Sequence, residues 1–180
     1  GFSVDVSTAD GSALLSDSDY TQITAQTFTF AGTASETETF TLVPTTDNKV
    51  EIDETVSISQ GGLIAGVVST GDIDITDGAT VTITNDDQAT VTIADVSGNE
   101  DDGPITVTLS LDNPVDGGFS VDVSTADGSA TTGDSDYTSV VSQTLTFAGT
   151  AGETETFTVT PTVDIKVEAN ETVSISQGGL

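Results

Sequence analysis

A long internal repeat restricts the architecture of this chain more than any other feature. Residues 1–63 align without a gap with residues 118–180, at an offset of 117, and the two segments differ at 15 of 63 positions. Solenoid repeats are about 20–50 residues long, whereas a period above about 100 residues is the size of one β-sandwich domain. The repeat therefore predicts one domain per period.

The domain boundary is expected near residue 88. The polar residues 85–88 (NDDQ) separate one alternating segment from a new one that starts at Ala89. We therefore predict that residues 1–88 form the C-terminal part of one module, without its first strands. Residues 89–180 then form the next module, without its last strand. Because the chain opens with Gly1 and not with Met or a signal peptide, we expect a window from a longer array of modules.

Apolar residues alternate with Thr, Ser and Asp along most of the chain, which is the period-2 pattern of half-buried β-strands. About seven such segments occur per period, and Asp-Gly turns separate several of them. One apolar face per strand is typical of antiparallel sheets that pack face to face. The sequence therefore predicts an all-β fold with a two-sheet sandwich in each module. The predicted strands are centred on residues 91–93, 105–111, 119–123, 145–147, 157–159 and 173–175, and on 81–83 in the first module.

Acidic residues far outnumber basic ones, with 30 Asp and Glu against two Lys and a formal charge of −28. This balance opposes nucleic-acid partners and anionic membrane surfaces, because both require a basic face. No apolar run is long enough for membrane insertion. Cys and His are absent, which excludes disulfides and the usual zinc, copper and iron sites.

The carboxylates cluster at the predicted strand ends, in places that recur in both copies. Calcium takes about six to eight oxygen ligands, so carboxylates from adjacent loops have to converge on it. Two lysines cannot neutralise these loops, and a bound Ca²⁺ is the simplest hypothesis; a solvated acidic surface is the alternative. The clusters are 164–171 (DIKVEANE) with its copy 47–54 (DNKVEIDE), 127–128 with 10–11 (both DG), 85–87 (NDD) and 99–102 (NEDD).

Several motifs, in a fixed order, resemble the Calx-β domain family. They are DY at 136–137, QTLTF at 143–147, GETETF at 152–157, the acidic segment 164–171 and the closing strand ATVTITNDD at 79–87. The resemblance covers essentially the whole chain, and it implies tandem immunoglobulin-like antiparallel β-sandwiches. Domains of this family occur in the calcium sensors of sodium–calcium exchangers and in large bacterial surface proteins.

The resemblance also implies a set of metal ligands. Lys166 and Lys49 match a position that binds through its backbone carbonyl. Hydrophobic residues on both sides of Asp164 replace a longer acidic run, which implies one or two calcium ions per module. Asp127 and Asp10 have two interpretations, ligand or Asp-Gly turn, and the sequence favours neither. The implied carboxylate ligands are Glu100, Asp127, Asp164, Glu168 and Glu171 in the second module, and Asp10, Asp47, Glu51, Glu54, Asp86 and Asp87 in the first.

Other polar residues have plainer interpretations. Glu153 and Glu155, like their copies in the first module, alternate with apolar positions and are predicted to lie on a solvated strand face. Tyr137 and its copy Tyr20 each follow an Asp and are expected to pack beneath the loops.

Together these observations predict a non-catalytic, calcium-binding repeat module that acts as a rigid structural or adhesive spacer in a long extracellular or cell-surface protein. Its expected partners are calcium ions and neighbouring identical modules. Two alternatives stay open: a binding module for glycans, ice or another surface protein, and a regulatory calcium sensor. A hydrolase with paired carboxylates is disfavoured, because no His, Cys or Arg supports it and no cleft-forming insertion is present.

Overall fold

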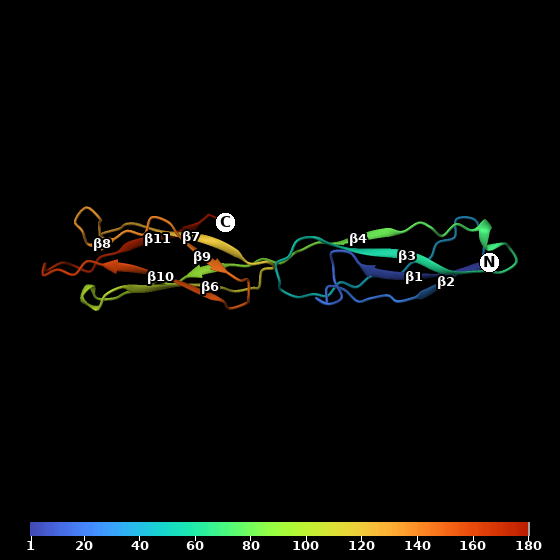
Figure 1. The fold of residues 1–180 in the computed structure, drawn as a ribbon, viewed down its shortest axis with the longest axis horizontal. Coiled ribbons are helices and arrows are strands. Elements are labelled where there is room, and N and C mark those ends of the chain that lie inside the picture. The colour runs from blue at the N-terminus through green and yellow to red at the C-terminus, as the bar shows by residue number, and fades with distance from the viewer. Residues whose placement is uncertain (180) are drawn as a thin grey trace. The chain divides into compact units, whose positions relative to one another are not determined.

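The computed structural model describes residues 1–179, which form antiparallel sheets joined by loops and two short 3₁₀ turns (Figure 1). The chain divides into two compact units. Unit 1 comprises Gly1–Asp47 and Ile52–Asp86, and unit 2 comprises Asn48–Glu51 together with the residues from Asp87 onward. The predicted module limits, 1–88 and 89–180, stay a prediction.

Unit 1 is a single antiparallel sheet with the strand order β2-β1-β3-β4. Alternation along β1 and β2 buries Val4, Val6 and Phe28 in one apolar cluster, and a second cluster contains Tyr20 and Val56. Its elements are β1 (Phe2–Asp10), β2 (Gln26–Phe30), β3 (Glu54–Ala65), the 3₁₀ turn η1 (Thr70–Asp72) and β4 (Ala79–Ile83).

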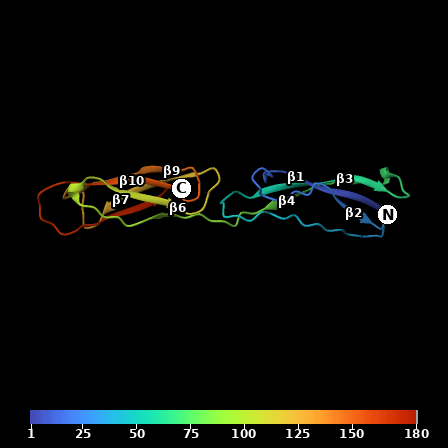
Figure 2. The same ribbon diagram turned by 90° about the horizontal axis from the view of Figure 1, so that it is seen from below.

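Unit 2 contains two antiparallel sheets, with the orders β5-β6-β10-β8 and β11-β7-β9 (Figure 2). Their strands are β5 (Val91–Ile93), β6 (Ile105–Leu111), β7 (Phe119–Asp127), β8 (Tyr137–Thr138), β9 (Gln143–Phe147), β10 (Thr154–Pro161) and β11 (Val173–Gly178), and η2 (Glu100–Asp102) is a 3₁₀ turn. Side chains from both sheets share one buried cluster, so the two sheets form the predicted sandwich. Its members include Val107, Leu109, Val121, Val123, Leu145, Phe147, Phe157 and Val159.

The predicted all-β antiparallel fold is confirmed, and a strand is present at each of the seven ranges predicted between residues 81 and 175. The sequence does not reveal β8, because a strand of two residues has no period to detect. No helix among residues 1–179 is long and apolar enough to cross a membrane.

A glutamate closes one turn in each unit, just before the stretch in which alternation predicts a solvated strand face. The Glu153 carboxylate accepts hydrogen bonds from the backbone N–H groups of Ala148, Gly149 and Thr150, at 2.8, 2.9 and 3.1 Å. Glu36 binds the three equivalent N–H groups in unit 1. A carboxylate this close in sequence to a turn can fold back and satisfy its donors, which strand alternation does not reveal.

Candidate metal centre

Three loops of unit 2 meet at one end of a sheet because of the strand register. Ile105, the first residue of β6, pairs with Val159 near the end of β10, and β8 pairs with the last two residues of β10. The loops before β6, before β8 and after β10 therefore lie side by side. Each of these loops carries carboxylates.

A first carboxylate group consists of Glu100, Asp164 and Glu168, whose oxygen atoms lie within 4.8 Å of one another. Glu100 comes from η2, and the other two residues come from the loop between β10 and β11. Burial raises the pKa of Glu100, and the nearby charges of Asp164, Asp101 and Glu168 raise it further. The group therefore concentrates negative charge that the fold itself does not neutralise.

A second carboxylate group consists of Asp136, Glu168 and Glu171, again with oxygen atoms within 4.8 Å of one another. Glu168 belongs to both groups, so five carboxylates form one connected cluster. Asp136 is held in place because its Oδ2 accepts a hydrogen bond from the backbone N–H of Thr131 at 2.8 Å. Burial raises the pKa of Glu171, and the charges of Asp136 and Glu168 add to that rise.

Lys166 supplies the positive charge at this cluster. Its ammonium group contacts Glu168 Oε1, and the hydrogen bond to Glu168 raises the pKa of Lys166. The backbone N–H of Lys166 also donates to Asp164 Oδ1 at 2.6 Å, which closes a tight turn between the two ligand candidates. One exposed ammonium group cannot balance five carboxylates.

Asp127 and Asp10 organise turns in the two units. Asp127 Oδ1 accepts hydrogen bonds from the backbone N–H of Thr132 at 3.0 Å and from the hydroxyl of Tyr137 at 2.9 Å. These two donors, the Thr132 N–H first, lower the pKa of Asp127. In unit 1, Asp10 accepts equivalent bonds, including one of 2.8 Å from Tyr20. The role of both aspartates in the turn is thus visible, and their role as ligands stays a prediction.

The tyrosines pack as predicted. Tyr137 is 5% exposed and Tyr20 is 3% exposed, each beneath the loop that its hydroxyl helps to fix. Burial raises the pKa of both hydroxyls, and the bonds to Asp127 and Asp10 add to the effect.

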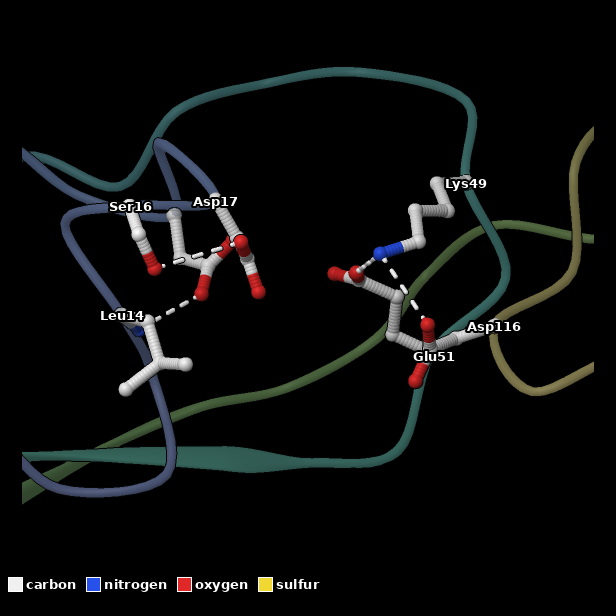
Figure 3. A network of polar contacts seen from close by, with 7 residues as sticks. Leu14, Ser16, Asp17, Lys49, Glu51 and Asp116 are labelled. Atoms are coloured by element: carbon white, nitrogen blue, oxygen red, sulfur yellow. Dashed lines mark hydrogen bonds and ion pairs between the residues drawn. The ribbon is translucent and has the colours of Figure 1, made fainter.

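The first-copy candidates include Lys49, which forms ion pairs. Lys49 Nζ lies 2.5 Å from Glu51 Oε1 and 3.3 Å from Asp116 Oδ1, so it bridges two carboxylates (Figure 3). The Glu51 hydrogen bond is the main reason why the pKa of Lys49 is raised. Glu54 begins β3. Asp47 and Asp86 are exposed, and Asp87 is half-buried. Metal binding by these residues, and by the backbone carbonyls of both lysines, stays a prediction.

Four of the predicted second-module carboxylates come together in the structure, namely Glu100, Asp164, Glu168 and Glu171. The fifth member of the cluster, Asp136, is absent from the predicted ligand set. The sequence signal for Asp136 is that it directly precedes Tyr137. The first copy has the same Asp-Tyr pair at positions 19 and 20. Alternation alone cannot show that β8 carries this residue to the end of β10.

A comparison with known domain families identifies the family of this chain. The profile of the Calx-beta domain family matches residues 2–95 and again residues 84–177, and the chain therefore belongs to this family, with two domains in tandem. Solved structures that match include CBD12 from CALX1.2, at 19% identity and a TM-score of 0.38, and the calcium binding domain CBD12 of CALX1.1, at 20% and 0.40. These matches cover 98% and 87% of this chain, and 67% and 61% of those chains. No curated protein matches.

Proposed function

We propose that this chain binds Ca²⁺ at the end of unit 2 where the three acidic loops meet. The observation that carries the proposal is the pair of carboxylate groups that share Glu168. Glu100, Asp136, Asp164, Glu168 and Glu171 would hold the ion. Carboxylate oxygens are the hard ligands that Ca²⁺ prefers, and five carboxylates that bind through one or two oxygens each can supply most of its about six to eight ligands.

The electrostatics of the cluster fit a divalent cation. The raised pKa values of Glu100 and Glu171 reflect burial together with repulsion between neighbouring carboxylates. A bound Ca²⁺ would supply the positive charge that Lys166 alone cannot. An ion that binds the folded chain and not the unfolded one also stabilises the fold, by about 2.7 kcal/mol at a hundredfold excess over Kd.

Calorimetric titration and thermal unfolding of the full chain test this proposal. We expect heat of binding from Ca²⁺, and a Tm for unit 2 that falls by several degrees when EDTA replaces Ca²⁺. Glu168→Gln removes the shared ligand and should weaken binding at least about tenfold. Glu155→Gln is the matched control, because it removes one charge from β10 outside both carboxylate groups. Absence of heat together with a Tm that EDTA leaves unchanged would contradict calcium binding.

The wider proposal is that the chain serves as a calcium-stiffened spacer in a long extracellular or cell-surface protein. Its support is the repeat itself, because near-identical consecutive modules add length without adding a new surface chemistry. Small-angle X-ray scattering of the full chain in Ca²⁺ and in EDTA tests this role. We expect a narrower distribution of maximum dimensions in Ca²⁺. Identical distributions in Ca²⁺ and in EDTA, with calcium binding intact, would refute the spacer role but not the proposed metal site.

A further inference from the structure

A short segment of the first copy is built into unit 2. We call Asn48–Glu51 the hook and residues 113–116 (NPVD) the receiving turn. The backbone N–H of Val50 donates to the carbonyl of Pro114, and the N–H of Asp116 donates to the carbonyl of Val50, both at 2.9 Å. Val50 and Val115 thereby form a parallel β-bridge. Lys49 adds its ion pair with Asp116, at 3.3 Å (Figure 3).

Contacts with the sandwich of unit 2 hold the receiving turn in place. The N–H of Val115 donates to the carbonyl of Gly149 at 2.9 Å, and the N–H of Gly118 donates to the carbonyl of Val115 at 3.2 Å. The Val115 side chain also packs against the buried cluster of unit 2. The turn thus presents one carbonyl, one N–H group and one carboxylate in a prearranged pattern, which lowers the entropic cost of binding.

The second copy contains nearly the same hook sequence, and no bridge among residues 1–179 engages it. Lys166, Val167 and Glu168 repeat the Lys-Val-Glu of the first hook, and the chain's two lysines are the two hook lysines. The Val167 residue is 99% exposed, whereas Val50 is half-buried. The Lys166 side chain is 62% exposed, compared with 32% for Lys49. No backbone hydrogen bond within residues 1–179 engages Val167.

We propose that residues 165–168 are a docking site for the receiving turn of a further copy of this repeat. The N–H and C=O groups of Val167 would bind the turn's Pro carbonyl and Asp N–H, and Lys166 would pair with the turn's Asp carboxylate. An exposed extended segment with an unpaired edge is a ready template for such bridging. The inference rests on the hook geometry and the repeat, and it holds whether or not calcium binds.

A loop exchange within the existing chain tests whether the second hook can make this contact. Asn48→Ile, Ile52→Ala and Asp53→Asn together give residues 47–54 the sequence of residues 164–171. We expect amide hydrogen exchange at Val50 and Asp116 to change by less than about threefold. Val50→Pro is the control for a lost hook, because it removes the donor to Pro114, and it should accelerate exchange at Asp116 at least about tenfold.

Two results of this exchange experiment would overturn the proposal. The triple variant would do so if its Asp116 amide exchanged as fast as in Val50→Pro. The proposal would also fail if Val50→Pro left the Asp116 amide unchanged, because the bridge would then not protect it in solution.

Supplying a further receiving turn tests the docking directly. A chain of residues 1–180 followed in register by a second copy of residues 64–180 gives Val167 the sequence context that Val50 has now. We expect the Val167 amide to become at least about tenfold slower in exchange than in the 180-residue chain, in Ca²⁺ and in EDTA alike. Unchanged exchange at Val167, with Val50 still protected, would refute docking and leave the proposed calcium site untouched.

Discussion

Two nearly identical stretches of this chain adopt different structures. Residues 36–44 (ETETFTLVP) and 153–161 (ETETFTVTP) differ at two positions. In unit 2 the stretch forms β10, which pairs with β6 and β8 and buries Phe157 to 2% exposure. In unit 1 the strand pairing of this stretch, among the described residues, is one isolated bridge between Tyr20 and Pro44, and Phe40 is half-buried.

The difference lies in the available partner strand and not in strand propensity. Among the described residues, β6 and β8 pair with β10, whereas no strand pairs with residues 37–43. The turn just before each stretch forms in both units, because Glu36 and Glu153 satisfy it with local hydrogen bonds. The local sequence is thus sufficient to form this turn, whereas strand formation requires a non-local partner strand.

The largest contrast between the units is expected from their equivalent phenylalanines. Phe157→Ala should lower the free energy of unfolding of unit 2 by about 3–5 kcal/mol, because it leaves a cavity in a close-packed core. Phe40→Ala should cost unit 1 about 1 kcal/mol, since that ring is only half-buried. Urea unfolding followed by NMR at the Val123 and Val6 amides measures each unit separately. Equal losses in the two units would contradict the link between strand pairing and burial of the phenylalanine.

A smaller contrast is expected at two equivalent glycines. Gly149 and Gly32 both have φ of +91°, but a Cβ on Gly149 would lie 2.0 Å from the carbonyl oxygen of Val115. The nearest atom to a Cβ on Gly32 is 3.5 Å away. Gly149→Ala should therefore cost about 2–4 kcal/mol, against about 1 kcal/mol of backbone strain for Gly32→Ala. The same unfolding experiment measures both, and a cost for Gly32→Ala that matches Gly149→Ala would be inconsistent with this steric account.

The two tyrosine hydroxyls are expected to behave alike in the two units. Tyr137→Phe and Tyr20→Phe each remove one hydrogen bond to an aspartate, so each should cost its own unit about 1 kcal/mol. This equality would sharpen the distinction between local contacts, which both copies make, and strand pairing, which only one makes. A measurable cost in one unit alone would argue that the turns also depend on strand pairing.

The smallest effect is a matched pH dependence of the two glutamate turns. Backbone N–H groups, first that of Ala148 or Ala31, lower the pKa of Glu153 and Glu36. A carboxylate with a lowered folded-state pKa stabilises the fold above its unfolded pKa of about 4.3, and this stability is lost as the pH falls through the folded value. The stability difference between the unaltered chain and Glu153→Gln, and likewise Glu36→Gln, should therefore shrink as the pH is lowered from about 5 to about 3. Urea unfolding across that range measures it, and a difference that does not vary with pH would exclude this contribution.

Much of the fold is predictable from the sequence because its signals are local. Alternation places strands such as β6 and β7, and the repeat transfers strands from one copy to the other. The repeat also predicts one strand that the structure does not contain, because residues 37–44 have the strand pattern but form no strand. A strand forms only where a partner strand lies beside it, and a local sequence pattern does not show whether such a partner exists.

The candidate site is predictable only in part for a similar reason. The high density of carboxylates in residues 164–171 predicts that this loop contributes to the metal site. The family resemblance adds Glu100 from a second loop. Asp136 reaches the cluster through the pairing of β8 with β10, and the folding back of Glu153 depends on turn geometry. Both are three-dimensional facts with weak sequence signals.

The hook should protect one of the two tryptic cleavage sites of this chain. Trypsin cuts after Lys and Arg, so this chain offers two cleavable bonds, after Lys49 and after Lys166. The first is followed by Val50, whose N–H and C=O groups are both bonded, and the second by Val167, which is 99% exposed. A protease must pull several residues into its cleft, so brief digestion should cut first after Lys166 and yield fragments 1–166 and 167–180 on a denaturing gel.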